Sequence, residues 1–219
     1  MFADAFRGRR VLVTGHTGFK GAWLSEWLLA LGAEVTGFAL EPQTEPALFD
    51  VLNLRQRLAR HVIGDVRDSA AVLDVMRETS PEHVFHLAAQ PLVRLSYHEP
   101  AATWATNVQG TIHVLEAIRA TPGVRACVVV TSDKCYENRE HVWGYRENEP
   151  FGGHDPYSSS KGAAEIAVSS WRRSFFHDPA GCRLATGRAG NVIGGGDWSA
   201  DRIVVDFVRA IADDRPLSL

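Results

Sequence analysis

Two pairs of ionisable residues in the second half of the chain could carry proton chemistry. Tyr157 and Lys161 stand four positions apart, so a helix that begins near Pro156 would project both side chains from one face. A tyrosine hydroxyl titrates near ~10, and a neighbouring ammonium stabilises the phenolate and lowers that pKa. Asp133 and Lys134 add an acid and a base. Together these side chains predict a site that takes a proton from an alcohol.

The apolar run at residues 126–130 favours a buried strand. Asp133 and Lys134 are therefore expected just beyond the carboxyl end of that strand. Each motif also has an ordinary interpretation. A Y-x-x-x-K spacing is typical of a solvated helix face, and an Asp after a strand is typical of a turn or a helix cap. The presence of a cofactor site elsewhere in the chain decides between these interpretations.

A glycine-rich segment near the amino terminus supplies such a site. Residues 10–14 predict a strand and residues 22–31 predict a mainly apolar helix, and the loop between them has the spacing G-x-x-G-x-x-G. Glycines at these places permit a tight turn, close approach of the backbone to a pyrophosphate and close helix packing. Lys20 lies either near the phosphates or in solvent. The predicted dinucleotide contacts of this loop are Gly15, Thr17, Gly18, Phe19 and Gly21.

The residue after the second predicted strand, at residues 33–40, bears on which dinucleotide is bound. Glu41 follows Gly21 by twenty positions, where an acidic residue accepts the hydroxyls of the adenosine ribose. No arginine follows Glu41 before Arg55 to bind a 2′-phosphate. The sequence therefore favours NAD over NADP.

Two further predicted strands, at residues 60–66 and 82–87, would end at the same edge of a parallel sheet. The strand at residues 60–66 ends with an acid and a valine at this edge. Small residues follow the strand at residues 82–87, where a cofactor would pass close to the backbone. His83 and His86 have no third ligand spaced to help, so no metal is expected. The predicted cofactor contacts are Asp65, Val66, Leu87, Ala88 and Ala89.

The remaining pattern predicts a doubly wound parallel sheet of α/β class, Rossmann-type, with six strands and six helices. The sixth strand is expected at residues 183–188. Asn107 lies within a helix expected at residues 100–120, and we predict that it contacts the cofactor. It is either a satisfied core amide or a residue that bends the helix and orders the site. Beyond residues 100–120, helices are expected at 68–79, 156–176 and 202–212, with a polar helical patch within 42–59.

Composition excludes several classes of partner. The chain of 219 residues is 45% hydrophobic and 22% charged with a net charge of −3, which gives no basic excess for nucleic acid. No apolar run approaches the ~20 residues that cross a bilayer, and no signal peptide is evident, so we expect a cytoplasmic protein without membrane contact. Cys127 is expected in the core, whereas Cys135 lies beside the site and is expected to be modifiable.

The assembled motifs resemble the extended short-chain dehydrogenase/reductase family. The family-wide features are Thr14-Gly15-x-x-Gly18-Phe19-x-Gly21, Asn107, Tyr157 and Lys161. Three longer strings, at residues 86–94, 131–138 and 190–198, resemble a branch of that family, the CDP-glucose 4,6-dehydratases. Related dTDP-glucose dehydratases carry Glu at the position of Lys134.

The resemblance implies a mechanism and a cofactor, NAD. Tyr157, assisted by Lys161, takes the proton of the C4 hydroxyl of CDP-glucose during oxidation, and Ser132 holds the same oxygen. Lys134 then removes the C5 proton and Asp133 protonates the departing C6 hydroxyl. Return of the hydride to C6 gives CDP-4-dehydro-6-deoxyglucose. The resemblance also implies a homodimer formed through the helices near residues 100–120 and 157–176.

The resemblance further implies a division of the chain into residues 1–189, a dinucleotide-binding domain with the catalytic residues, and residues 190–219, the incomplete start of a nucleotide-sugar-binding region. Most of the small carboxyl-terminal substrate region is expected to be absent. Two other functions stay open: a nucleotide-sugar 4-epimerase, which has no use for Asp133 and Lys134, and a non-catalytic NAD-binding fragment. The predicted substrate contacts are Gln90, Asn191 and Arg202.

Overall fold

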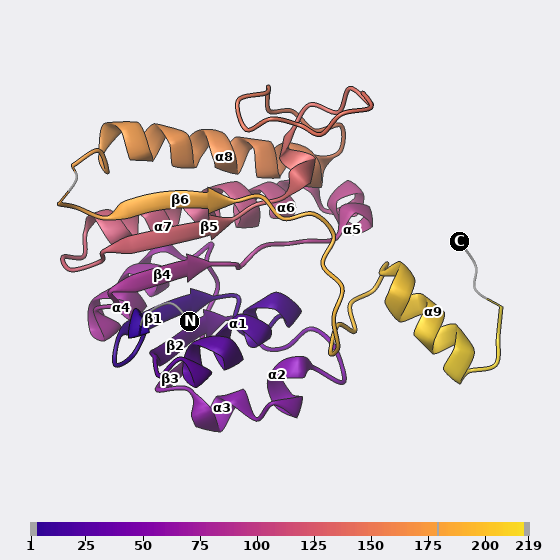
Figure 1. Ribbon diagram of the computed structural model, residues 1–219, viewed down its shortest axis with the longest axis horizontal. Helices are drawn as coiled ribbons and strands as arrows, with labels where there is room; N and C mark the ends of the chain where they lie inside the picture. Colours follow the sequence, from indigo (N-terminus) through magenta and orange to yellow (C-terminus); the bar gives the residue numbers. More distant parts are fainter. Residues whose placement is uncertain (1–3, 179, 217–219) are drawn as a thin grey trace.

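A six-stranded parallel sheet forms the centre of the protein (Figure 1). The computed structural model describes residues 4–178 and 180–216. The strand order is β3-β2-β1-β4-β5-β6, and every neighbouring pair is parallel. This order confirms the predicted doubly wound, Rossmann-type sheet. The strands are β1 (Arg10–Thr14), β2 (Glu34–Ala39), β3 (Arg60–Ile63), β4 (His83–His86), β5 (Ala126–Val130) and β6 (Arg183–Gly187).

Helices connect the strands, and the described residues hold more helices than the six predicted. The expected helical patch within residues 42–59 is two short helices, and no helix was predicted at Val93–His98. Within the described ranges, no helix is long and apolar enough to cross a membrane. The α-helices are α1 (Phe19–Ala30), α2 (Leu48–Val51), α3 (Leu54–Arg57), α4 (Ser69–Thr79), α5 (Val93–His98), α6 (Pro100–Trp104), α7 (Gly110–Arg119), α8 (Pro156–Ser174) and α9 (Ile203–Ala212).

Two apolar cores lie on opposite faces of the sheet because successive side chains of a strand alternate between faces. Val11 and Val13 of β1 pack with residues of α1, α2 and α3 on one face. Leu12, between them, packs with residues of α4, α7 and α8 on the other. Helices on both faces leave the two ends of the strands as the places where a ligand can approach the sheet.

The helix expected at residues 100–120 is a continuous run interrupted by one π-helical turn. α6 leads into η2 (Ala105–Gln109), and η2 leads into α7. Asn107, in the π turn, accepts a hydrogen bond from Gln90 N at 2.8 Å and donates to Gln90 O at 3.1 Å and to Ser160 Oγ at 2.9 Å. Asn107 is thus a satisfied core amide, and its contacts also tie the residues after β4 to α8.

The start of α8 is fixed by its cap. Asp155 accepts hydrogen bonds from Ser158 N at 2.9 Å and from Ser158 Oγ at 2.6 Å, and Pro156 occupies the first helical position. This D-P-x-S sequence therefore ends the preceding loop at Asp155 and begins the helix at Pro156. Tyr157 and Lys161 therefore project from the first two turns of α8.

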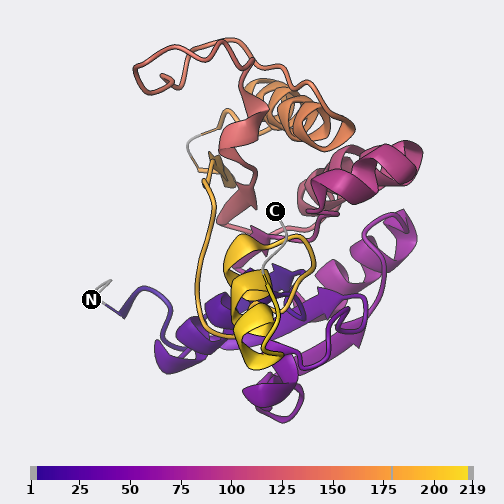
Figure 2. The same cartoon turned by 90° about the vertical axis from the view of Figure 1, so that its right-hand side faces the viewer.

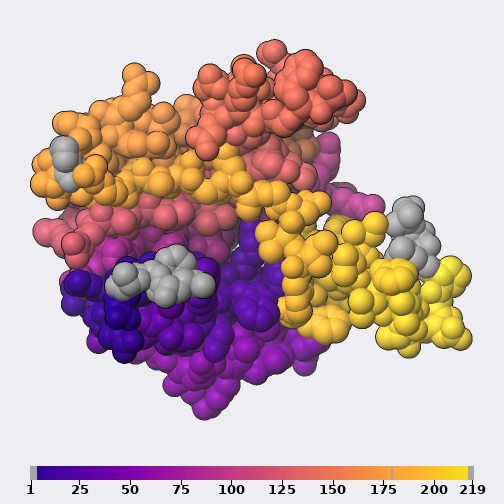
Figure 3. Space-filling view, viewed as in Figure 1, coloured from indigo at the N-terminus to yellow at the C-terminus, as the bar shows by residue number. Residues whose placement is uncertain are grey.

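The segment after β6 leaves the body of the protein and ends in α9, which lies beyond the carboxyl ends of the strands (Figures 1 and 2). The space-filling view shows α9 at the margin of the molecule (Figure 3). Val205 and Ala210 are the buried residues of α9. Its outer surface carries the exposed apolar side chains of Ile203, Val204, Phe207, Val208 and Ile211. A narrow face of α9 therefore attaches it to the domain.

The Asn107 contacts give a stability prediction. Asn107→Ala removes three hydrogen bonds and leaves buried partners unsatisfied, so the free energy of unfolding should fall by about 2 to 4 kcal/mol. Gln109→Ala is the matched control, because Gln109 is exposed in the same π turn, and its effect should stay within about 0.5 kcal/mol. Urea denaturation measures both, and equal effects of the two substitutions would contradict the assignment.

Candidate active site

The carboxyl ends of four strands bring the predicted site residues together. Thr14 of β1 pairs with His86 of β4, and Val130 of β5 pairs with Gly187 of β6. The glycine loop, residues 87–90, residues 131–134 and residues 188–198 follow these four strands. The residues that follow β1, β4, β5 and β6 are consequently neighbours at a single edge of the sheet.

Tyr157 and Lys161 lie on the face of α8 that packs toward this edge. Both are buried, with 9% and 6% of their surface exposed. The Lys161 Nζ donates to Val130 O at 3.4 Å, and Tyr157 N donates to Ser96 Oγ at 3.2 Å. The pair is therefore not a solvated helix face, and it is held against the end of β5.

Burial sets the pKa values of the pair. Desolvation, assisted by the charge of Lys20, lowers the pKa of Lys161 to about 8, and the carboxylate of Glu165 opposes this shift. Desolvation raises the pKa of Tyr157, opposed by the Ser132 side chain and the charge of Arg202. The prediction that Lys161 lowers the pKa of Tyr157 is thus wrong for this structure, because burial outweighs the favourable contacts and those contacts come from other residues.

The turn after β5 presents the second pair. It forms the short helix η3 (Asp133–Cys135), in which the Ser132 hydroxyl accepts from Lys134 N at 3.2 Å and donates to Asp133 Oδ1 at 3.0 Å. Lys134 Nζ lies 4.0 Å from Asp133 Oδ1, and both side chains are about half exposed. Ser132 is buried while the acid and the base face outward, so all three can meet one substrate.

The glycine loop after β1 makes a close approach to the residues after β4. Gly15 has a φ of +77°, and a Cβ there would lie 2.6 Å from Ala88 N. A Cβ at Gly21 would collide with Gly15 O. Thr14 Oγ1 accepts from Ala88 N at 3.3 Å, and Thr14 O accepts from Leu87 N at 3.1 Å. The packing therefore requires glycine at positions 15 and 21.

The far end of the predicted cofactor site contains two ion pairs. Glu41 pairs with Arg55 at 2.8 Å, and the pKa of Asp65 is lowered, chiefly by its hydrogen bond with the Arg67 guanidinium. Thr17 Oγ1 donates to Leu40 O at 2.8 Å, which fixes the glycine loop beside the Glu41 backbone. Four further predicted contacts are placed as follows: Phe19 against Gly194, Val66 against Gly110, and Gly18 and Ala89 in the loops after β1 and β4.

A histidine pair also shapes the glycine loop. His16 is fully buried, its Nε2 lies 2.7 Å from His61 Nδ1, and its ring fills the space where Gly37 lacks a Cβ. Burial and the neighbouring His61 lower the pKa of His16 to about 3. The His16 ring is therefore neutral at ordinary pH.

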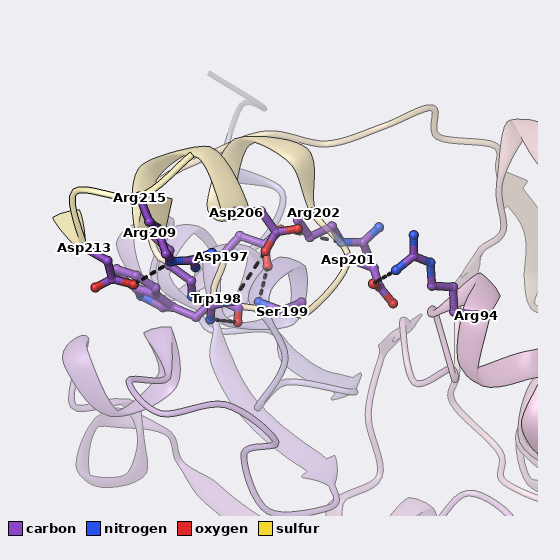
Figure 4. Close-up of polar contacts among 10 residues, drawn as sticks. All are labelled: Arg94, Asp197, Trp198, Ser199, Asp201, Arg202, Asp206, Arg209, Asp213 and Arg215. Atoms are coloured by element: carbon purple, nitrogen blue, oxygen red, sulfur yellow. Dashed lines mark hydrogen bonds and ion pairs between the residues drawn. The ribbon is translucent and has the colours of Figure 1, made fainter. Parts of the chain in front are cut away.

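The three predicted substrate residues differ in their surroundings. The Gln90 side chain is occupied within the protein, because it donates to Leu92 O and Thr103 Oγ1 and accepts from Leu92 N. Asn191 is exposed. Arg202 lies 3.9 Å from Asp197 in a polar cluster that also contains the Arg94–Asp201 ion pair (Figure 4). Arg202 is the one of the three whose charge reaches both Tyr157 and Lys20.

Cys135 and His86 are both buried in the structure. Cys135 is fully buried, and desolvation and the charge of Glu165 raise its pKa to about 11, so the expectation that it is modifiable is wrong. His86 is a buried strand residue whose ring lies between Thr14 Oγ1 at 2.7 Å and Thr111 Oγ1 at 3.1 Å. Among residues 4–178 and 180–216, no His, Cys, Asp and Glu side chains cluster as a metal site would require.

Sequence reasoning missed a buried carboxylate and a pattern in the basic residues. Glu165 follows Lys161 by four positions, so the helical spacing that joined Tyr157 to Lys161 also predicts Glu165 on the same face. Only three of the 23 basic residues are lysines, namely Lys20, Lys134 and Lys161, and each lies in a segment of this site. Lysine differs from arginine in that burial readily lowers its pKa, as desolvation does for Lys20 and Lys161.

The fold, the glycine loop and the buried Tyr157–Lys161 pair define a Rossmann-type protein with a candidate site at one edge of the sheet. Comparison with known sequences makes this specific, because the profile of the GDP-mannose 4,6-dehydratase family matches residues 12–188. The chain belongs to this family.

Individual relatives carry related activities. Over 214 residues, the chain is 53% identical to the CDP-glucose 4,6-dehydratase of Salmonella typhimurium, covering 96% of this chain and 59% of the relative. Two solved structures superpose with a TM-score of 0.80. The first is a dTDP-glucose 4,6-dehydratase from Streptomyces venezuelae with NAD bound, which is 26% identical, with 94% of this chain and 62% of that chain covered. The second is a UDP-glucose 4-epimerase from Thermus thermophilus with NAD, which is 28% identical, with 96% of this chain and 65% of that chain covered. The chain thus spans about three fifths of its relatives.

The buried charge of Lys161 predicts an unusual dependence of stability on pH. An unfolded lysine keeps its proton up to about 10.4, whereas the folded Lys161 loses it near 8, so the unfolded state binds more protons between these values. The folded state therefore bears a cost of about 3 kcal/mol below pH 8, and this cost disappears as the pH rises toward 10.4. Lys161→Met should stabilise the chain at pH 7 and have a smaller effect at pH 10.

Urea denaturation of the two proteins at pH 7 and pH 10 measures this difference. Lys134→Met is the control, because Lys134 is about half exposed, and it should change the free energy of unfolding by no more than about 0.5 kcal/mol at either pH. A Lys161→Met variant that is less stable than the wild type at pH 7 would contradict the proposed burial cost.

Proposed function

We propose that this chain is the dinucleotide-binding and catalytic part of an NAD-dependent enzyme that dehydrates CDP-glucose to CDP-4-dehydro-6-deoxyglucose. One observation carries the proposal. Ser132, Asp133 and Lys134 leave β5 at the sheet edge against which Tyr157 and Lys161 are buried. The identity of 53% with a CDP-glucose 4,6-dehydratase supports the choice of nucleotide sugar.

The residues at the sheet edge fit a dinucleotide. The close approach of Gly15 to Ala88 leaves backbone, rather than side chains, facing the path between β1 and β4, as a pyrophosphate requires. Gly15, Gly18 and Gly21 would line this path, and Glu41 would accept from the adenosine ribose. NAD would supply a reversible hydride acceptor for the sugar. Related structures with NAD bound support the same cofactor here.

Tyr157, Ser132 and Lys161 serve the oxidation of the sugar. The Tyr157 phenolate accepts the proton of the C4 hydroxyl, and the Ser132 hydroxyl donates a hydrogen bond to the same oxygen. Since burial raises the pKa of Tyr157, the reaction needs local positive charge to form the phenolate. Arg202, just before α9, supplies such charge, and Lys161 lies one helical turn from Tyr157 on α8.

Lys134 and Asp133 serve the elimination of water. A C4 ketone makes the C5 proton acidic, and the neutral amine of Lys134 removes it. The Asp133 carboxyl group donates a proton to the C6 oxygen, which leaves as water. The step balances, because one proton leaves C5, one proton joins the hydroxyl, and a C5–C6 double bond forms. The 4.0 Å between Lys134 Nζ and Asp133 Oδ1 lets both groups reach adjacent carbons.

A 4-epimerase is the second candidate, because UDP-glucose 4-epimerases share this fold. An epimerase uses the tyrosine and the serine but needs neither a base for C5 nor an acid for C6. The acid and base that directly follow Ser132 favour the dehydratase.

We also propose that two copies of the chain pair through α6, α7 and α8. The support is the apolar surface on α6 and α8, where Trp104 and Ile166 are 42% and 59% exposed. Apolar side chains of this size on adjacent helices are typical of an interface between subunits.

The dehydratase proposal predicts a specific product. The gene product at its natural length, incubated with CDP-glucose and NAD, should form a 4-keto-6-deoxy sugar that absorbs in alkali. Lys134→Ala removes the C5 base and should lower the rate by about 100-fold or more. Arg139→Ala, an exposed residue of the following loop, is the matched control and should keep the wild-type rate. A product that is only the C4 epimer of CDP-glucose would contradict the proposal.

A further inference from the structure

A buried ion pair outside the residues used by the proposed mechanism lies directly behind the site. Glu165, on α8, and Arg188, the residue after β6, form an ion pair of 3.1 Å. Their side chains are 2% and 18% exposed. Two charges withdrawn from water this far cost more than an equivalent apolar pair, so stability alone does not account for them.

The Glu165 carboxylate connects the two halves of the site. Its Oε1 accepts a hydrogen bond from the hydroxyl of Thr131, the residue directly before Ser132. Glu165 also follows Lys161 by one helical turn on the same face of α8. One carboxylate is therefore attached to the helix that carries the tyrosine and lysine, and bonded to the strand end that carries the serine, acid and base.

The Arg188 guanidinium extends this connection to the loop that leads away from the site. Its Nη1 donates to Tyr136 Oη at 2.7 Å and to Glu147 O at 3.1 Å, while its Nη2 donates to Glu165. The guanidinium also lies over the rings of Tyr136 and Phe151, at 5.1 and 4.8 Å from their centroids. Four of these five contacts are with the 136–151 loop, and they hold both of its ends.

Backbone hydrogen bonds near Glu165 and Arg188 connect the same segments as their side chains do. Thr131 N donates to Gly187 O at 2.9 Å and Asp133 N donates to Ala189 O at 3.1 Å, so the strand end lies beside the residues that flank Arg188. Gly152 N donates to Cys135 O at 2.9 Å, which closes the loop over the same turn. Residues 131–136 are thus held from three sides.

We propose that Glu165 and Arg188 are positioning residues that hold Ser132, Asp133 and Lys134 at a fixed distance from Tyr157 and Lys161. This inference rests on the proposed dehydratase function. Dehydration needs oxidation at C4 and elimination across C5 and C6 in one bound sugar, so both groups of residues must keep one mutual geometry. A displacement of about 1 Å is enough to lower a rate by about 100-fold.

The double variant E165L/R188M separates positioning from stability. It replaces the ion pair by apolar side chains and leaves no unpaired buried charge, an exchange that is often neutral or stabilising. The control is R60M/E78L, which makes the same exchange at the half-exposed Arg60–Glu78 pair far from the site. If E165L/R188M does not fold, E165Q takes its place with the same measurements.

Two readouts decide the proposal, with the gene product at its natural length. Steady-state kinetics with CDP-glucose should show kcat lowered by about 10- to 100-fold with KM and the Kd for NAD unchanged. Amide hydrogen exchange should be faster in residues 131–137 of E165L/R188M and unchanged in R60M/E78L. A folded variant with the kcat of the wild type overturns the positioning role, whatever its exchange rates.

The two proposals can fail separately. If the wild type does not dehydrate CDP-glucose, the proposed function fails, and exchange at residues 131–137 then decides the inference alone. Faster exchange in the variant supports the positioning of this segment by Glu165 and Arg188, and unchanged exchange overturns it.

Discussion

The parallel pairing of β1, β4, β5 and β6 is the constraint on which the site depends. Parallel strands need crossovers that cover the faces of the sheet, so residues that bind a ligand can collect at a strand end. The close contact of Gly15 with Ala88 shows how tightly this edge is packed, since even a methyl group at Gly15 would collide with backbone. The glycine loop, the residues after β4 and the turn after β5 are therefore positioned by one register.

Buried charge is the second constraint. Lys161, Glu165 and Arg188 are ionisable groups withdrawn from water behind a half-exposed acid and base. The burial of Lys161 shifts its pKa to about 8, which destabilises the folded chain at neutral pH. Such an arrangement is typical of a functional site, where perturbed proton affinities are retained at a cost in stability. In the proposed function, the inner charges fix positions and the outer pair meets the substrate.

The sequence was sufficient to predict the six strands, the class of sheet and the principal helices, because alternating apolar runs and glycine loops are local signals. It also predicted that the segment after β5 and the Y-x-x-x-K helix converge. It did not predict α5. It also did not predict the π turn at Asn107, where the side chain bonds to Gln90 and Ser160 from other elements. The raised pKa of Tyr157 and the burial of Cys135 are also tertiary effects.

The partners of the Arg188 and Gln90 side chains are evident only from the three-dimensional structure. Arg188 looked like the end of a strand, and its contacts with Glu165, Tyr136 and Glu147 join residues that lie 23 to 52 positions apart. Gln90 looked like a substrate contact, whereas both ends of its amide are occupied within the protein. A single sequence contains the residues of such networks but not their pairing.

In the proposed reaction, one site oxidises C4 of the sugar and then reduces C6 with the same hydrogen. The most direct test uses CDP-glucose labelled with deuterium at C4, incubated with the gene product at its natural length, and locates the label in the product by NMR. The account predicts deuterium at C6 of a 4-keto-6-deoxy sugar. Deuterium retained at C4, in substrate or epimer, would contradict it.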